Sequence, residues 1–424
     1  MKKLTKILAL VLCAALIVCL FAGCGSKSSK GSVYWLNFKP EADEALQNIA
    51  AAYTKETGVE VKVVTAASGN YESTLVSEMD KSAAPTLFVV GNSASVNTWS
   101  DYCLDLKGTD VYNELTTDSF TLYDGDKACS IGYCYESYGI IVNKTLLAEA
   151  GYSIDDIYNF DSLKAVADDI HARADELGFD AFTSAGMDDS SSWRFSGHLA
   201  NMPLFYEMRD DGWTECPAEI TGAYLDNFKQ IWDLYITDSA YDPATLATGG
   251  YDAEGEFLAG SAVFYQNGTW EYSALSANYS NDEMAMIPIY CGVDGEEDAG
   301  LCSGTENCWA VNAKASEADQ QATLDFMYWL VTSDEGTAMM AEQFGAIPYK
   351  SAAASDNIFL TNANEYLAEG KYNVDWAFNY TPNVNDWRAA LVSAMNQYDN
   401  GGSWDDVCTA FTAGWATQYA AANS

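Results

Sequence analysis

Residues 32–64, SVYWLNFKPEADEALQNIAAAYTKETGVEVKVV, contain the succession of elements that decides the fold. The stretch begins with aromatic and β-branched side chains, which predict a strand. Apolar side chains then recur at helical spacing in residues 41–57, and Gly58 predicts the end of that helix. Alternating valines in residues 59–63 predict a second strand. A strand, a helix and a strand in this order form the unit of a mostly parallel sheet.

The alternation of strands and helices continues along the chain. Helical spacing in residues 71–82 and a short buried strand in PTLFVVGN, residues 85–92, complete a β-α-β-α-β succession. Asp161 is the predicted N-cap of a later helix, and Gly178 is its predicted C-terminal stop. Further strands are expected at 180–184, 262–266 and 284–289, and further helices at 317–335, 387–398 and 404–420.

The length of the chain predicts two lobes. Its 424 residues exceed what one hydrophobic core usually supports, even without an N-terminal leader. No internal repeat and no Pro/Gly/Ser-rich linker follows residue 32. The lobes should therefore share the chain through crossovers rather than occupy separate halves of it.

The N-terminus has the pattern of an export leader. Three lysines among the first six residues precede an apolar run at 7–21, which is too short for a comfortable membrane span. The run ends in LFAGC, which resembles a bacterial lipobox, and this predicts removal of residues 1–23 and lipidation of Cys24. Residues 24–31 are a polar, flexible tether. A plain signal peptide with a chance cysteine is the alternative.

The charge balance excludes one class of partner. The chain has 61 acidic and 21 basic residues, a net charge of −40, so nucleic-acid phosphates would repel it. Anionic lipid would repel it as well, so the lipid on Cys24, and not the protein surface, should hold it at a membrane. Hydrophobic residues make up 49% and aromatic residues 13%, which is ample for a packed core and argues against disorder.

The sequence offers little for metal, cofactor or covalent chemistry. It has two histidines and no CxxC pair, so we expect no metal site and no cofactor. Motifs of serine hydrolases, zinc peptidases, P-loop proteins and Rossmann domains are missing. A catalytic pair of carboxylates for glycoside hydrolysis stays open, since no pair stands out. Disulfide pairing also stays open for the eight cysteines after the leader and lipobox: Cys103, Cys129, Cys134, Cys216, Cys291, Cys302, Cys308 and Cys408.

Polar and aromatic side chains gather at the predicted strand ends. Ligands of open α/β sheets bind beyond the carboxyl ends of the strands. A sugar needs flat aromatic rings to stack on and directional hydrogen-bonding groups for its hydroxyls. In isolation, NGTW at residues 267–270 also fits a tight turn followed by a core tryptophan. The candidates at strand ends are Asn37, Lys39, Asn92, Asn267, Trp270, Gly304, Thr305 and Glu306.

The order of these elements resembles one protein family over nearly the whole chain after the leader. The most specific stretches are YESYGIIVNKTLLAEAG, residues 135–151, and FLAGSAVFYQNGTW, residues 257–270. VYWLNF, TKETGVEVKV, APTLFVVGN, FMYWLVTSDEG and FGAIP follow the same order. The chain resembles the extracellular solute-binding proteins of carbohydrate ABC transporters, in the branch that includes the maltodextrin-binding proteins.

The resemblance implies a two-lobed α/β fold of the type II periplasmic-binding-protein kind, with a ligand cleft between lobes joined by a multi-crossover hinge. The N-terminal lobe would comprise residues 32–136 and 305–348, and the C-terminal lobe residues 137–304 and 349–424. A monomer without catalytic residues would pass its cargo to ABC permease subunits driven by a cytoplasmic ATPase. Its place would be the outer face of the bacterial cytoplasmic membrane.

The resemblance also implies which side chains contact the sugar. The acidic residue that faces the sugar in the family corresponds to Glu136, and its two stacking tryptophans correspond to Trp270 and Trp387. Trp193 is a looser match, and PTL at residues 85–87 departs from the family's Pro-Asp-hydrophobic run. Asn37, Lys39 and Asn92 match N-lobe polar contacts.

The strand after Tyr135 divides its side chains between two faces. Residues 140–142 should be core strand, whereas Tyr138 should share the cleft side with Glu136, because residues two apart on a strand face the same way. Tyr135 and Ser137 would face the opposite side. A hinge-region ion pair is the alternative role for Glu136.

Other functions remain open. A surface glycoside hydrolase, a glycan-binding adhesin and a binding protein for a non-sugar polar solute are the alternatives to sugar capture. A binding protein that presents ligand to a sensor kinase would share the fold. An anionic cargo would need cationic partners, and Lys39, Arg194 and Arg388 are the few candidates.

Overall fold

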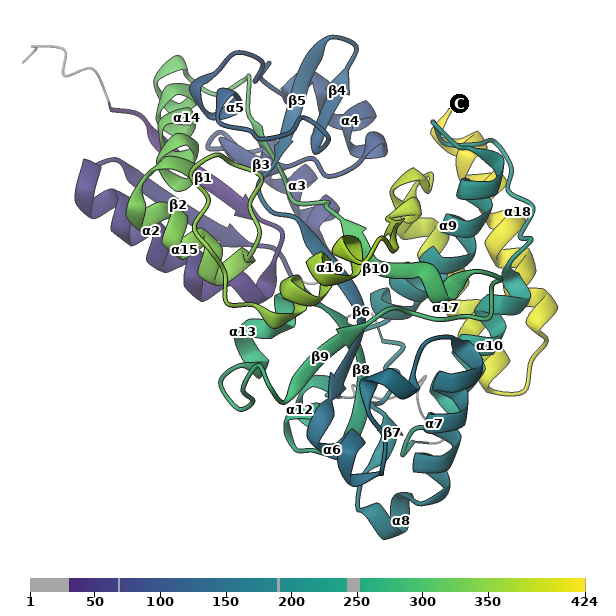
Figure 1. Cartoon of the computed structure of the whole chain (residues 1–424). Helices are drawn as coiled ribbons and strands as arrows, with labels where there is room; N and C mark the ends of the chain where they lie inside the picture. The colour runs from purple at the N-terminus through teal and green to yellow at the C-terminus, as the bar shows by residue number, and fades with distance from the viewer. Residues whose placement is uncertain (1–29, 68, 189–190, 242–251, 424) are drawn as a thin grey trace, which may run out of the picture.

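The computed structural model describes residues 30–67, 69–188, 191–241 and 252–423. In these residues the chain forms two β-sheets, each with its own hydrophobic core and its own covering helices (Figure 1). The predicted two-lobed α/β fold is thereby confirmed. The predictions for the leader, Cys24 and most of the tether lie outside the described residues. No helix within those described ranges is both long enough and apolar enough to span a bilayer.

The first sheet contains the β-α-β succession found in the sequence. Its first three strands pair in parallel, β1 with both β2 and β3, and β11 then pairs antiparallel with β3 and β5. Its order is β2 (Glu60–Thr65), β1 (Ser32–Asn37), β3 (Leu87–Val89), β11 (Cys308–Val311), β5 (Lys127–Gly132) and β4 (Thr121–Asp124).

The helices of the first lobe follow the predicted positions with one difference. The predicted helix at 317–335 is two helices, because Ser333 has an extended backbone that ends the first, while its hydroxyl caps Gly336 of the second. The helices around the first sheet include α2 (Asp43–Thr57), α3 (Tyr71–Met79), α4 (Ser93–Trp99), α14 (Glu317–Thr332) and α15 (Asp334–Phe344).

Strand β6 (Glu136–Asn143) is the centre of the second sheet and is buried along its whole length. Residues 140–142 are completely buried, which confirms the predicted core strand. Gly139 is required here, since a Cβ would lie 2.3 Å from the backbone oxygen of Ile287 on the neighbouring strand. Around β6 lie β8 (Ala262–Gly268), β9 (Met284–Ile287) and β10 (Ala299–Gly304), with β7 (Asp180–Phe182) and β12 (Tyr372–Asp375) at the edges.

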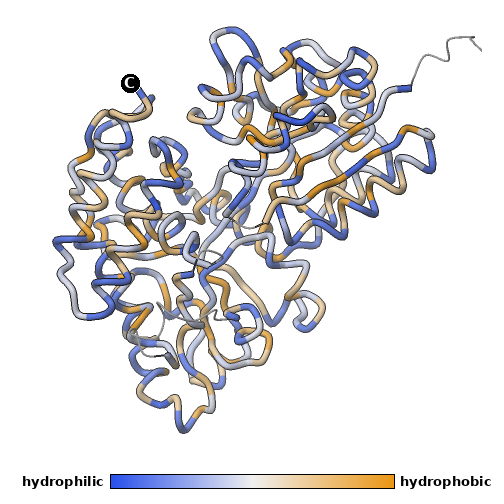
Figure 2. Tube along the Cα trace, turned by 180° about the vertical axis from the view of Figure 1, so that it is seen from behind, coloured by the Kyte–Doolittle hydropathy of each residue, from blue (hydrophilic) through white to orange (hydrophobic). Residues whose placement is uncertain are grey.

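Helices with one apolar face cover the second sheet. Figure 2 shows hydrophilic and hydrophobic residues alternating along these helices, as expected for helices that lie between a core and solvent. The larger ones are α7 (Phe160–Ala172), α9 (Ala200–Asp211), α10 (Leu225–Thr237), α16 (Ile358–Ala368), α17 (Val384–Asp399) and α18 (Trp404–Ala422).

The predicted N-cap Asp161 is wrong. Asn159 caps α7 instead: its side chain accepts from the backbone of Ser162 at 2.9 Å, and the Ser162 hydroxyl accepts from the backbone of Asn159 at 3.0 Å. This reciprocal pair fixes the start of the helix before the buried Phe160. The helix predicted to run up to Gly178 is two helices in the structure, since α7 ends at Ala172. Gly178 adopts the left-handed conformation after the separate short helix α8 (Ala174–Leu177).

The chain passes between the two sheets three times. It crosses from β5 to β6, from β10 back to β11, and from α15 to α16. The crossing segments are hydrogen-bonded to one another: the Tyr133 amide donates to the Asn307 oxygen at 2.8 Å, and the Tyr135 amide donates to the Ala346 oxygen at 2.9 Å. The lobes are therefore joined by three adjacent segments, although the lobe boundaries given above stay a prediction.

Replacing Trp35 with alanine should destabilise the first lobe. Trp35 is fully buried, and its ring contacts the rings of Tyr133, Trp309 and Phe326 at centroid distances of 5.9–6.2 Å. Loss of a buried aromatic side chain costs about 3–5 kcal/mol of unfolding free energy. Urea denaturation would measure this loss of unfolding free energy. Tyr328→Ala, on the exposed side of α14, is the control and should cost less than about 1 kcal/mol; equal losses would contradict this account.

Candidate ligand-binding site

A buried ion pair lies where the crossing segments meet the end of β1. The ammonium of Lys39 is 2.7 Å from Oε1 of Glu136, and the Asn307 amide donates to Oε2 of Glu136 at 2.6 Å. Glu136 and Lys39 are only 4% and 5% exposed. Burial alone would lower the pKa of Lys39, but the charges of Glu136 and Glu41 outweigh it and hold that pKa above its usual value. The lysine is therefore cationic in the folded protein.

Asn37 shapes the turn that presents Lys39. Its side-chain oxygen accepts from the backbone of Lys39 at 2.9 Å, and its amide donates to the backbone oxygen of Lys39 at 2.6 Å. A further hydrogen bond of 3.0 Å joins the amide to Thr65 at the end of β2. The residues just after β1 thus place Lys39 at the carboxyl end of the parallel strands.

Strand β8 ends in the sequence NGTW, which places an indole over a glycine. The Asn267 side chain accepts from Trp270 Nε1 at 2.8 Å and donates to Oε1 of Glu271 at 2.8 Å. A Cβ on Gly268 would lie 2.2 Å from the Trp270 ring, so only glycine lets the ring lie there. Trp270 itself is partly exposed, and its ring centroid is 5.3 Å from the Lys39 ammonium.

Three further aromatic rings continue from Trp270. The His198 ring stacks on Tyr138 at 3.8 Å between centroids, and Trp193 contacts His198 edge-on at 4.9 Å. Trp270 lies 5.5 Å from His198 and 6.0 Å from Trp193. His198 belongs to a π-helical turn, Arg194–Leu199, a rare conformation that is frequent at functional sites.

His198 is neutral at physiological pH. Burial, with added repulsion from Arg388 and Arg194, holds the pKa of His198 well below its ordinary value of 6.5. Its Nδ1 lies 3.1 Å from the amide nitrogen of Gln266, which can only donate. A neutral His198 adds no positive charge to the site.

A second polar group lies at the loop between β10 and β11. The backbone oxygen of Glu306 packs against Gly91, where a Cβ would come within 2.2 Å of it. Burial raises the pKa of the Glu306 carboxyl to about 7, although the charge of Arg388 and a hydrogen bond from Asn92 oppose the rise. Arg388, from α17, donates to the hydroxyl of Ser196 at 3.1 Å. Both lobes therefore contribute side chains around Glu306.

The structure brings several of the predicted residues together. Lys39, Glu136, Tyr138, Trp193 and Trp270 form the ion pair and the aromatic cluster just described. Asn37, Asn92 and Thr305 lie next to this group, and their side-chain oxygens serve turns or caps, since Asn92 accepts from Ser95 and Thr305 accepts from Asn307. The Asn92 side chain also bonds to Glu306. Gly304 pairs with Glu136 across β10 and β6 and leaves room for the ring of Trp376.

Trp387 is placed differently from the expectation. It is fully buried among the helices, where its Nε1 donates to the Phe411 oxygen at 2.9 Å and its ring packs on Trp415. The position of α17 turns Trp387 inward and leaves the neighbouring Arg388 toward the Ser196 hydroxyl. We therefore leave Trp387 out of the proposed site.

Sequence reasoning missed His198 and Asn307 and treated Arg194 and Arg388 only as available cations. The one signal for His198 is its position in SSSWRFSGHL, next to Trp193. Among the residues that the structure describes, no three His, Cys, Asp or Glu side chains come together as a metal site would require.

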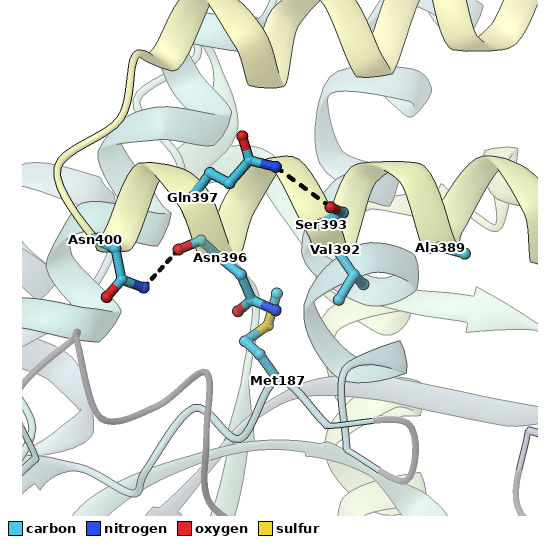
Figure 3. Close-up of a pocket in the computed structure, with 7 residues that line it drawn as sticks. All are labelled: Met187, Ala389, Val392, Ser393, Asn396, Gln397 and Asn400. Atoms are coloured by element: carbon cyan, nitrogen blue, oxygen red, sulfur yellow. Dashed lines mark hydrogen bonds between the residues drawn. The ribbon is translucent and has the colours of Figure 1, made fainter.

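A separate hollow lies on the surface of α17 (Figure 3). Its volume is about 570 Å³, and Met187 faces a row of small and amide side chains across it. Two of these amides are already engaged, Gln397 with Ser393 and Asn400 with the backbone of Asn396. The hollow shares no lining residue with the ion pair and aromatic cluster, so we do not assign it the main binding role.

One family model and several solved structures are similar to this chain. Residues 48–366 match the family model described as bacterial extracellular solute-binding protein. No curated protein matches the sequence. The solved structures with a similar fold include the solute-binding protein RafE in complex with raffinose, with 18% identity over 90% of this chain and 98% of that one and a TM-score of 0.72. The apo form of RafE, from Streptococcus pneumoniae, has 19% identity over 90% and 97% and a TM-score of 0.64.

A second protein with a similar fold is the GacH receptor of Streptomyces glaucescens, described unliganded and in complex with acarbose. It has 18% identity over 92% of this chain and 98% of that one, with a TM-score of 0.69. A third protein carries the name chitin oligosaccharide binding protein, with 16% identity over 92% of this chain and 98% of that one and a TM-score of 0.66. At these identities the likeness establishes the shared fold.

The carboxyl groups near the site should make stability depend on pH. Burial and the charge of Glu254 raise the pKa of Glu271 to about 8, and the pKa of Glu306 is about 7, against an ordinary 4.5. Below about pH 4.5 both groups are protonated in the folded and unfolded chain. Between pH 4.5 and 8 the unfolded chain ionises first, so the contribution of both groups to stability falls as pH rises.

Glu271→Gln should reduce this loss of stability with rising pH. Glutamine keeps an oxygen for Asn267 but carries no charge, so the variant should lose less thermal stability than the wild type between pH 5 and pH 8.5. Melting temperatures at the two pH values measure the difference, with Glu149→Gln, at the exposed end of α6 (Lys144–Glu149), as the control. An equal loss in wild type and Glu271→Gln would show that Glu271 does not carry the effect.

Proposed function

The chain belongs to the family of bacterial extracellular solute-binding proteins, and from that premise we propose that it captures a carbohydrate between its lobes and delivers it to an ABC import permease. The observation that carries the proposal is the combination of a partly exposed indole, Trp270, with the buried polar group of Lys39, Glu136 and Asn307. The indole suits the apolar face of a sugar ring, and the buried polar group suits its hydroxyls.

The polar group of Lys39, Glu136 and Asn307 retains hydrogen-bonding capacity for a ligand. Each carboxylate oxygen accepts about two hydrogen bonds, and each oxygen of Glu136 has one partner among Lys39 and Asn307. Glu136 can therefore accept two further hydroxyl protons. The Lys39 ammonium has three protons and two carboxylate partners, Glu136 and Glu41, which leaves one proton for a ligand oxygen. Such a group penalises ligands that lack the matching hydroxyls.

The aromatic cluster supplies the stacking surface that a sugar ring needs. Trp270 and Trp193 are both partly exposed, and their rings meet at an angle of 52°. Two rings at an angle offer more than one sugar ring a stacking surface, which favours an oligosaccharide over a monosaccharide. The names of similarly folded proteins, which include raffinose, acarbose and a chitin oligosaccharide, support the same class of cargo.

The rest of the proposal concerns the setting of the protein. Lipidation at Cys24 would tether it to the outer face of the cytoplasmic membrane, with residues 24–31 as a spacer. It would act as a monomer, without catalysis, and its partner would be a permease with a cytoplasmic ATPase. Closure of the lobes on the ligand would use the three adjacent crossing segments as the hinge.

A thermal-shift screen tests the proposed cargo. The form without leader and tether, residues 31–424, would be heated with neutral oligosaccharides, monosaccharides, polyols and uronates. A ligand that binds only the folded state adds about 2.7 kcal/mol at one hundred times its Kd, which raises the melting temperature. We expect a shift with one series of oligosaccharides. Shifts with non-sugar solutes alone would contradict carbohydrate capture.

Two variants test the site with the ligand so found. Trp270→Ala should weaken binding at least tenfold, because stacking and apolar burial together contribute about 1.4 kcal/mol or more. Glu136→Gln should weaken it as well, since an amide offers one acceptor oxygen where the carboxylate offers two. Calorimetric titration measures both affinities.

The matched control is Trp213→Ala. Trp213 is a partly exposed tryptophan of the same lobe that packs on Tyr380 and Trp415, away from the ion pair. Its replacement should leave affinity unchanged. Normal affinity in both Trp270→Ala and Glu136→Gln would mean that the ligand binds elsewhere.

A further inference from the structure

One buried cation of the proposed site, Lys39, is already neutralised. The Lys39 ammonium lies between two carboxylates, at 2.7 Å from Glu136 and 3.1 Å from Glu41. One positive charge between two negative charges leaves a net charge of −1. Glu136 and Lys39 are almost completely buried, whereas the side chain of Glu41 is 41% exposed and so lies at the rim.

The second cation is enclosed by protein groups. Arg194 is 3% exposed, and its guanidinium lies over the rings of Phe195 at 5.1 Å and Tyr265 at 5.5 Å. It also donates to the backbone oxygen of Gln266 at 3.5 Å, and its charge acts on the carboxyl of Glu271. A ligand carboxylate would have to displace these aromatic contacts to reach Arg194.

The third cation is engaged in the same way. Arg388 donates to the Ser196 hydroxyl at 3.1 Å and interacts with the charge of Glu306. Lys39 has two carboxylates in direct contact with its ammonium, Glu136 and Glu41. Arg194 and Arg388 are instead engaged by aromatic rings, a backbone oxygen and a hydroxyl.

The shared ammonium leaves no partner for a further buried negative charge beside Glu136. Lys39 already contacts both Glu136 and Glu41. A ligand anion placed next to this group would therefore be an uncompensated buried charge, which is costly.

We infer, on the basis of the proposed function, that the site takes uncharged saccharides and rejects those that carry a carboxylate or a phosphate. Glu41 has a particular part in this selection. It is the exposed member of the pair that holds Lys39, and it approaches the ammonium from the rim, where an anionic sugar would otherwise pair with that ammonium. Glu41 therefore occupies the position that a ligand carboxylate would need.

The experiment compares matched ligands on wild type and two variants. The probes are neutral xylo-oligosaccharides and gluco-oligosaccharides, raffinose, and the uronate counterparts of the first two series, each titrated by calorimetry and by thermal shift. In the wild type we expect each uronate to bind at least tenfold more weakly than its neutral counterpart. Glu41→Lys should reduce that ratio at least threefold, by freeing Lys39 and adding a positive charge at the rim.

Glu60→Lys is the matched control. This variant makes the same change of charge in the same lobe, but at the end of β2 that is away from the site. Thr65, at the opposite end of β2 from Glu60, is the residue that contacts Asn37 of the site. Its ratio of neutral to uronate affinity should equal that of the wild type. Melting temperatures of the free variants show whether each one is folded.

The outcomes separate the inference from the function on which it rests. Uronates that bind the wild type as tightly as neutral sugars, or more tightly, would overturn the inference and leave carbohydrate capture standing. An unchanged ratio in folded Glu41→Lys would overturn the part assigned to Glu41. No binding by any saccharide, neutral or charged, would overturn the proposed function and this inference with it.

Discussion

The ion pair between Lys39 and Glu136 is the constraint on which the rest of the structure depends. Both charges are almost completely removed from solvent, and a buried charge is tolerable only when a partner and further hydrogen bonds satisfy it. The partners come from different parts of the chain: Lys39 follows β1 of the first sheet, Glu136 begins β6 of the second, and Asn307 lies on the return crossing. Satisfying one carboxylate therefore fixes three segments relative to one another.

This arrangement unites the two roles that the sequence left open for Glu136. It forms an ion pair at the junction of the lobes, and it still has lone pairs available for a ligand. A ligand that binds there would contact the same group that joins the lobes. Binding at the proposed site would then be coupled to lobe geometry through a single carboxylate, because any movement of Lys39 relative to β6 leaves part of that carboxylate unsatisfied.

Much of the fold could be predicted because hydrophobic periodicity determines it. Helical spacing of apolar residues located α2, and runs of aromatic and β-branched residues indicated β1 and β6, which are almost continuously buried. Helix boundaries were harder to predict where two residues could each act as the N-cap. Asn159 and Asp161 are such a pair, and the reciprocal hydrogen bonds between Asn159 and Ser162 decide between them. For the site, resemblance pointed to Glu136 and Trp270. Trp387 shows its limit, since the helix face it occupies depends on tertiary packing. His198 could not be found from the sequence, because a π-helical turn and the ring of Tyr138 define its place.

Strand β11 has a consequence for how the protein is made. It lies in the interior of the first sheet, between β3 and β5, yet in sequence it follows almost the whole second sheet. A chain that emerges from its N-terminus cannot complete the first sheet before residue 311 is available. Contacts between residues so distant in sequence form slowly. This order of strands delays completion of the first lobe until most of the polypeptide has been made.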